Sequence, residues 1–181
     1  KDHFMTISPD EGSMSRAIYL ANVLGVDMGM YYKRLDYSKY VNGRHPIAAY
    51  EFLGPKIEGK DMILIDDMIS SGDTIIKIAS LLKEKGAGKV YICSTFGFFT
   101  DGLEKFDEAH KKGYFDKLLT TNLVYQSPEL LEKPYYISCD MSKYIALIID
   151  TLNHDTSISH LLNPVDRIKR CVNNYMSQYE K

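Results

Sequence analysis

The chain has 181 residues, 45% of them apolar and 25% charged, with a formal net charge of −2. This length is sufficient for one domain with a substantial core, and the nearly balanced charge gives no reason to expect nucleic acid or an acidic membrane surface as a partner. No apolar run approaches the ~20 residues that span a bilayer, and the sequence does not open with a secretory signal. Three cysteines without metal-ligand spacing indicate a reduced, cytoplasmic protein.

The first part of the chain alternates between predicted strands and helices. Residues 4–8 are typical of a strand, a helix is expected from about 13 to 24, and Gly25 is placed to end it. A second strand is expected over 26–32, followed by a polar, tyrosine-rich stretch over 33–55 that lacks clear periodicity. A loop of this length in a compact domain is usually functional or mobile.

The remaining elements continue the alternation. An apolar strand at 61–65, a helix at 74–85 and a strand at 90–94 form a βαβ unit. Further elements are expected in this order: a helix near 102–112, strands at 117–121 and 135–138, an apolar helix at 141–152, a short segment at 156–162 and a helix at about 164–179. This order predicts an α/β fold with a doubly wound, mainly parallel sheet flanked by helices. We expect a single domain over 1–181, with its core reaching about residue 162 and a C-terminal helix over 163–181.

The most informative segment is the end of the strand at 61–65. Asp66 and Asp67 follow it directly, at the edge where open α/β sheets place their ligands. The next helix begins after a hydroxyl-rich turn, and helix starts attract anions. The residues of this turn are Ser70, Ser71, Gly72, Asp73 and Thr74. The two carboxylates could bind the hydroxyl groups of a sugar and the helix start could bind a phosphate, so the segment is suited to a sugar phosphate. The alternative is a polar strand end with a serine N-cap. A Walker phosphate loop is excluded, because Gly-Lys-Ser/Thr is absent.

A second candidate site follows the first predicted strand, at the same edge of the sheet. Its residues are Asp10, Glu11, Gly12 and Ser13. The Asp10 carboxylate could bind Mg²⁺, which prefers one or two carboxylates together with substrate phosphates. Backbone N–H groups near Gly12 could hold a pyrophosphate. The alternative is a capped helix start, since aspartate is a favoured capping residue.

Two further groups of polar residues lie at the ends of predicted strands. Lys33 and Arg34 open the long loop and could neutralise charge on transferring phosphate oxygens, although such cations are often plain solvated surface. Residues 120–122, Thr-Thr-Asn, could add hydroxyl or amide contacts. The five histidines show no metal-binding spacing, so none is assigned a role.

These motifs resemble a known family. The segment 61–74 resembles the ribose-5-phosphate loop of type I phosphoribosyltransferases. Over about residues 4–162 the chain resembles the C-terminal half of a ribose-phosphate pyrophosphokinase (phosphoribosyl pyrophosphate synthetase). Besides that loop, the resemblance rests on Ser-Pro-Asp-x-Gly at 8–12, Lys-Arg at 33–34 and Ser-x-Ser-x-Leu at 157–161. It implies a homo-oligomeric enzyme of nucleotide biosynthesis that, with Mg²⁺, transfers pyrophosphate from ATP to ribose 5-phosphate and so makes phosphoribosyl pyrophosphate.

The resemblance also implies roles for single residues. Asp10 would belong to the pyrophosphate loop and bind metal. Asp66 and Asp67 would hold the ribose, Asp66 also through magnesium. Residues 70–74 would bind the 5′-phosphate. Lys33 and a basic neighbour would stabilise the transition state, because this kind of transfer depends mostly on positioning and charge.

The chain departs from the family pattern at several positions. The family usually carries lysine and, two residues later, arginine, whereas here Leu35 stands at that position and Arg34 lies between. The phosphate loop reads Ser-Ser-Gly-Asp-Thr where many members have Asp-Thr-x-Gly-Thr. Asp73 would place a carboxylate close to the phosphate, which is unfavourable unless it turns outward or caps the helix. The stretch 36–55 also differs from the family's loop.

The N-terminal half of the family supplies a metal-binding histidine and much of the ATP site, and nothing in this sequence matches it. The chain also opens without methionine, which is typical of a piece of a longer protein. We therefore expect it to bind ribose 5-phosphate or phosphoribosyl pyrophosphate but to make little product alone. Two alternatives stay open: a phosphoribosyltransferase acting on a nucleobase, and a non-catalytic, synthetase-like regulatory subunit, which Leu35 and Asp73 favour.

Overall fold

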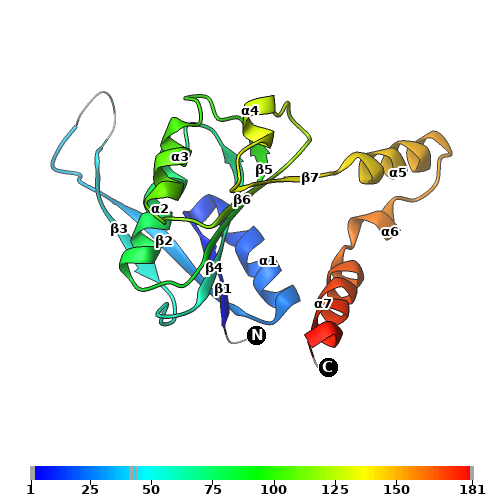
Figure 1. Cartoon of the computed structure of the whole chain (residues 1–181), viewed down its shortest axis with the longest axis horizontal. Coiled ribbons are helices and arrows are strands. Elements are labelled where there is room, and N and C mark those ends of the chain that lie inside the picture. The colour runs from blue at the N-terminus through cyan, green and yellow to red at the C-terminus, as the bar shows by residue number, and fades with distance from the viewer. Residues whose placement is uncertain (1–2, 41–42, 44, 180–181) are drawn as a thin grey trace. The chain divides into compact units, whose positions relative to one another are not determined.

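The computed structural model describes residues 3–40, 43 and 45–179 and divides into two compact units, Lys1–Cys139 and Asp140–Lys181 (Figure 1). The sequence predicted one domain with a core reaching about residue 162, so the expected boundary does not coincide with this division. The apolar helix predicted over 141–152 is present in the second unit, where the Ile149 and Leu152 side chains are 62% and 58% exposed.

The first unit is built on a seven-stranded sheet with the strand order β3-β2-β1-β4-β5-β6-β7. Its strands are β1 (Phe4–Ser8), β2 (Asp27–Leu35), β3 (Ile47–Leu53), β4 (Asp61–Ile69), β5 (Val90–Gly97), β6 (Lys117–Thr121) and β7 (Tyr136–Cys139). Neighbouring strands are parallel, except that β2 and β3 pair antiparallel. The predicted α/β class with a mainly parallel sheet is confirmed.

The helices of this unit are η1 (Glu11–Ser13), α1 (Met14–Leu24), α2 (Asp73–Glu84), α3 (Glu104–Lys111) and α4 (Pro128–Leu131). The β1-α1-β2 and β4-α2-β5 crossovers run in opposite directions along the sheet. Because such crossovers are right-handed, α1 and α2 lie on opposite faces, as Figure 1 shows. The order therefore reverses between β1 and β4, which is where open α/β sheets bind ligands.

The core lies between the central strands and the helices that cover them. Short continuous apolar runs form the central strands, as parallel sheets buried on both faces require. Its fully buried side chains include Met5, Ile7, Met62, Leu64, Ile78, Leu82, Ile92, Phe106 and Leu118. Gly25 ends α1 as predicted: it adopts a left-handed conformation with φ 67°, and its N–H donates to the Ala21 carbonyl at 2.8 Å.

Two strands run further than predicted. β4 continues to Ile69, so Asp66 and Asp67 lie within a strand and not in a loop after it. β2 continues to Leu35 and turns back through β3, so the predicted loop over 33–55 is wrong at both ends. The sequence concealed this hairpin because charged residues end β2 and β3 is an edge strand without a buried face. Residues 41, 42 and 44 of the connection lie outside the described residues.

The second unit contains α5 (Ser142–Asn153), α6 (Ser159–Leu162) and α7 (Val165–Tyr179). Within it, the Tyr144 hydroxyl donates to the Leu161 carbonyl at 3.0 Å, and the Arg167 guanidinium lies over the Tyr144 ring at 5.8 Å from its centre. Across the described part of the whole chain, no helix combines the length and apolar character needed to cross a bilayer.

Candidate functional site

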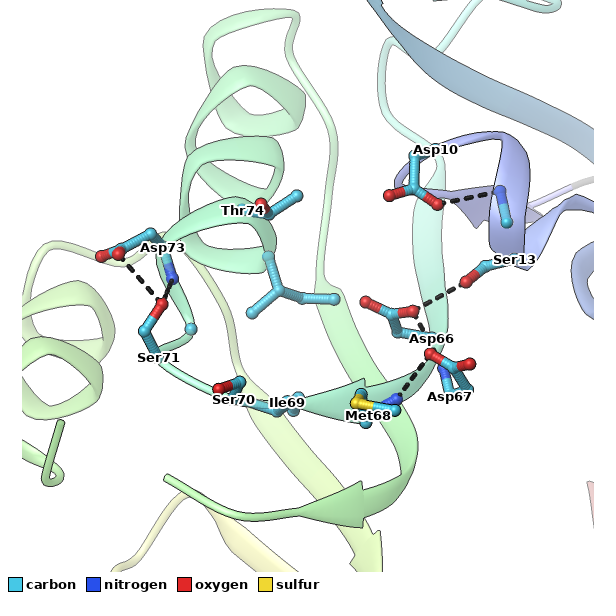
Figure 2. A pocket seen from close by; sticks show the side chains of 13 residues that line it. Asp10, Ser13, Asp66, Asp67, Met68, Ile69, Ser70, Ser71, Asp73 and Thr74 are labelled. Carbon is cyan, nitrogen blue, oxygen red and sulfur yellow. Dashed lines mark hydrogen bonds between the residues drawn. The ribbon is translucent and has the colours of Figure 1, made fainter. Parts of the chain in front are cut away.

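A cavity of about 370 Å³ opens beyond the carboxyl end of β1 and beside the end of β4 (Figure 2). Two segments line it, because β1 and β4 are parallel neighbours and their carboxyl ends meet at one edge of the sheet. The lining residues are Asp10, Gly12, Ser13, Asp66, Asp67, Met68, Ile69, Ser70, Ser71, Gly72, Asp73, Thr74 and Ile75. The structure thus brings together the two motifs predicted from the sequence. Of the four predicted pyrophosphate-loop residues, Glu11 is exposed and does not line the cavity.

Asp66 lies at the centre of the cavity wall. Its Oδ1 atom accepts two hydrogen bonds, from the Ser13 hydroxyl at 2.7 Å and from the Asp67 N–H at 2.9 Å. Figure 2 shows its other oxygen directed into the cavity. Burial raises the pKa of Asp66 above its usual value and the nearby Asp10 carboxylate acts in the same direction, while the two hydrogen bonds oppose the rise.

Asp10 has the capping role that the sequence offered as one alternative, and its role as a metal ligand stays a prediction. It is the N-cap of η1, where its Oδ1 atom accepts the Gly12 N–H at 3.1 Å. Its Oδ2 atom forms an ion pair with the Lys33 ammonium at 3.1 Å. A capping residue can therefore also present a carboxylate to the cavity.

Lys33 and Arg34 do not share a location, although both were predicted as catalytic. They lie on β2, where consecutive side chains point to opposite faces. Lys33 approaches the cavity through Asp10, whereas the Arg34 Nε atom pairs with the Glu51 carboxylate of β3 at 2.8 Å. Leu35 ends β2, and the pairing with β3 shifts its register between Arg34 and Leu35.

The turn before α2 leaves the start of this helix open. Gly72 is its N-cap residue, with φ 84°, and a Cβ atom there would overlap the ring of the fully buried Phe106. The first helical hydrogen bond runs from the Ile76 N–H to the Gly72 carbonyl, 3.0 Å, so the preceding N–H groups have no partner within the helix. These groups and the hydroxyls of Ser70 and Thr74 are suited to an anion.

Asp73 turns away from the position where an anion would bind. Its side chain is 68% exposed, its Oδ1 atom pairs with the Lys105 ammonium at 2.8 Å, and its Oδ2 atom accepts the Ser71 hydroxyl at 2.9 Å. These hydrogen bonds, with that from Lys105 the larger, lower the pKa of Asp73. The sequence left two arrangements open for Asp73, a side chain turned outward and one that caps the helix. The structure shows the side chain turned outward.

Sequence reasoning missed two cations near the site. The Arg16 guanidinium of α1 lies 3.4 Å from the Asp67 carboxylate and also donates to the Gly12 carbonyl. Its spacing of three residues from Ser13 places both on one side of the helix start, which was a usable signal. Lys105 reaches Asp73 from α3, and no local pattern predicts that approach.

The threonines of residues 120–122 do not contribute to this cavity. The Thr120 hydroxyl is buried against the Tyr136 hydroxyl, and the Thr121 hydroxyl donates to the Thr95 carbonyl at 2.6 Å. Their hydroxyl groups serve the interior of the sheet.

The residues that line the cavity suit a hard cation. They include Asp10, Asp66 and Asp67 and neither lysine nor arginine, while the carboxylate of the fourth lining aspartate, Asp73, is turned outward to Lys105. Asp10 lies close enough to Asp66 to raise its pKa. Among the residues that the structure describes, no group of three or more His, Cys, Asp or Glu side chains forms a metal cluster. Mg²⁺ is commonly held by one or two carboxylates with waters and substrate phosphates, so this pair fits that ion.

Comparison with known proteins gives consistent results. Residues 43–163 match the family model described as "Phosphoribosyl synthetase-associated domain". The ribose-phosphate pyrophosphokinase of Shewanella oneidensis is 30% identical over 163 residues, which are 90% of this chain and 49% of that protein. That of Thermococcus kodakarensis is 32% identical over 121 residues, 66% of this chain and 39% of that protein. This chain therefore spans about half or less of the length of these relatives.

The fold has a solved counterpart. The crystal structure of phosphoribosylpyrophosphate synthetase from Mycobacterium smegmatis superimposes with a TM-score of 0.70, at 22% identity, over 85% of this chain and 46% of that one. This likeness confirms the fold predicted from the sequence.

Proposed function

The chain belongs to the phosphoribosyl synthetase-associated family, and we propose that it forms the ribose-5-phosphate side of a ribose-phosphate pyrophosphokinase. The reaction transfers the β,γ-pyrophosphoryl group of ATP to the anomeric hydroxyl of ribose 5-phosphate and releases AMP. One observation carries the proposal. A single cavity presents carboxylates on one side and an open helix start on the other.

The carboxylates suit the sugar. Asp66 and Asp67 can accept hydrogen bonds from the ribose hydroxyls, and hydrogen bonds to charged acceptors are the stronger ones. The N–H groups at the start of α2 and the hydroxyls of residues 70–74 then take the 5′-phosphate. The sugar phosphate would lie along β4, with its anomeric carbon towards the loop that carries Asp10.

The residues near Asp10 suit the pyrophosphoryl group. Lys33 is 27% exposed and faces the Asp10 carboxylate, so it can shift to a transferring phosphate oxygen without a change in the strand. Asp10 and Asp66 would hold Mg²⁺, which would neutralise phosphate charge as it builds up. Their carboxylates repel one another in the free protein, and a bound cation removes that repulsion.

Titration calorimetry with ribose 5-phosphate tests this proposal. We expect binding that strengthens when Mg²⁺ is added. A chain that binds no ribose 5-phosphate in either condition contradicts the proposal. Because the chain aligns with about half or less of each relative, we also expect little AMP from Mg·ATP and ribose 5-phosphate with this chain alone. Rapid AMP formation would show that expectation to be wrong.

One observation favours a second candidate, a synthetase-like subunit that binds ligands without catalysis. Arg34 pairs with Glu51, and Leu35 stands two residues after Lys33, where the resemblance implies an arginine. A Leu35→Arg substitution in the longer protein distinguishes the two candidates. A large gain from a very low rate of AMP formation supports the non-catalytic subunit, and a substantial rate that the substitution leaves unchanged supports the enzyme. That the protein forms homo-oligomers and is cytoplasmic stays a prediction.

A further inference from the structure

The loop expected to bind the 5′-phosphate carries an aspartate, Asp73, at the start of α2. Asp73 is the first residue of α2, where its carboxylate and a phosphate would compete for the same positive helix end. Two like charges at such a short distance repel one another strongly where water is partly excluded. An unrestrained Asp73 would therefore oppose the ligand that the loop binds.

The contacts of Asp73 remove this conflict. Both of its carboxylate oxygens are used, one by Lys105 at 2.8 Å and the other by the Ser71 hydroxyl at 2.9 Å. Figure 2 shows the side chain on the outer side of the loop, away from Asp10 and Asp66. The carboxylate is thus both neutralised and turned outward before any ligand arrives.

Lys105 is itself held in place by its neighbours. Its ammonium also pairs with Asp101, one helical turn earlier, at 2.9 Å. The next residue, Phe106, is fully buried against Gly72 of the same loop. Lys105 and Phe106 are adjacent on α3. The packing of Phe106 against Gly72 therefore also brings the Lys105 ammonium close to Asp73.

We propose that Lys105 is a positioning residue that holds the Asp73 carboxylate away from the bound 5′-phosphate. The inference rests on the proposed function, because it assumes a phosphate at the start of α2. Lys105 does not line the ligand cavity, so it acts through Asp73 and not by direct contact. Its effect on affinity must then depend on the charge of residue 73.

A double-mutant cycle tests this dependence. The variants are Lys105→Met, which keeps the aliphatic stem, Asp73→Asn, and the double substitution, each titrated calorimetrically with ribose 5-phosphate and with inorganic phosphate. We expect Lys105→Met to raise the Kd about fivefold, which is the upper range for one exposed ion pair. The increase in Kd should be larger at low salt, because the repulsion from Asp73 is then less screened. In the Asp73→Asn background the same change should leave the Kd unaltered. Lys112→Met is the matched control, since Lys112, the residue directly after α3, pairs with Glu108 of that helix at 3.6 Å.

Each outcome decides the proposal. Equal weakening by Lys105→Met in both backgrounds would mean that Lys105 only supports the loop, and no weakening in either would mean that it does nothing for the phosphate. Either result overturns the inference. If the unaltered chain binds phosphate but not ribose 5-phosphate, the proposed function fails while the phosphate titrations still test Lys105. If it binds neither, both fail.

Discussion

The two loops that face each other across the cavity are stabilised in different ways. The loop after β1 is closed by a hydrogen bond within it, from the Gly12 N–H to Asp10, and the Lys33 ammonium of β2 pairs with the same carboxylate. The loop before α2 has a glycine at the helix N-cap and is held from outside by Phe106 and Lys105 of α3.

This difference separates the two chemical tasks. At the β1 loop the Asp10 carboxylate already has a cationic partner in Lys33, so a metal ion or pyrophosphate must replace that contact. At the α2 start the N–H groups have no partner within the helix, and the one side-chain contact that the described residues make there is the long hydrogen bond from the Asp73 N–H to the Ser71 hydroxyl at 3.4 Å, so a phosphate displaces little. The loop after β1 is thus suited to ligands that replace an existing ion pair, and the loop before α2 is suited to direct binding of an anion.

The largest expected effect concerns the external support of the second loop. Gly72→Ala would strain a residue with φ 84° and force Cβ against Phe106, so we expect a loss of about 3 kcal/mol in the free energy of unfolding. Gly113→Ala is the control, because Gly113 has φ 73° but open space around it, and should cost only about 1 kcal/mol. Urea denaturation measures both. Equal losses would show that the Phe106 contact does not matter.

The next effect concerns the carboxylate between the two loops. Asp66→Asn keeps an oxygen for Ser13 and the Asp67 N–H but removes the charge, so the Kd for ribose 5-phosphate with Mg²⁺ should rise roughly 10- to 100-fold. Asp27→Asn is the control, since Asp27 pairs with Lys60 at 2.7 Å outside the cavity. Similar titration curves for Asp66→Asn and the unaltered chain would exclude Asp66 from ligand binding.

A smaller effect should separate the two cations of β2. Lys33→Ala removes the partner of Asp10 and should weaken pyrophosphate binding about fivefold. Arg34→Ala breaks only the contact with Glu51 and should leave pyrophosphate binding unchanged. Calorimetry with Mg-pyrophosphate provides the measurement. Equal weakening in both variants would mean that Arg34 reaches the cavity in solution and that the sequence-based pairing of the two is right.

The smallest effect is on the pH dependence of stability. Because the pKa of Asp66 is raised on folding, its protonated form favours the folded state, and this contribution is lost as pH rises through the raised value. Asp66→Asn is neutral throughout. Its stability relative to the unaltered chain should therefore be lowest in acid, rise as pH passes from about 4 through the raised pKa, and then level off. A urea midpoint difference that stays constant with pH would contradict the raised pKa.

Local patterns predicted the elements that bring the site together. The strands at 4–8 and 117–121 occur at the predicted residues, because both are short segments of apolar and β-branched residues in a parallel sheet. Asp10, Asp66 and the turn before α2 meet because parallel strands share one carboxyl edge. These inferences needed only strand order and residue type.

Contacts made by elements distant in sequence could not be predicted in this way. Lys105 meets Asp73 only because α3 packs Phe106 under Gly72, and this depends on the whole interior. The β2–β3 hairpin was hidden because an edge strand needs no buried alternation. The sequence analysis placed Lys33 and Arg34 in a loop, and so it could not predict that their side chains make contacts in different places. Their position on β2 shows this difference.

The extension of β4 to Ile69 has a consequence for ligand affinity. Asp66 and Asp67 lie on a backbone that is hydrogen-bonded to β5 as far as the pairing of Ile69 with Gly97, although β1 pairs with β4 only as far as Leu64. Asp66 and Asp67 thus lie beyond the last residue of β4 that pairs with β1, while the pairing with β5 still fixes their backbone. A sugar that binds there meets acceptors that are preorganised, so little conformational entropy is lost on binding and more of the contact energy is retained as affinity.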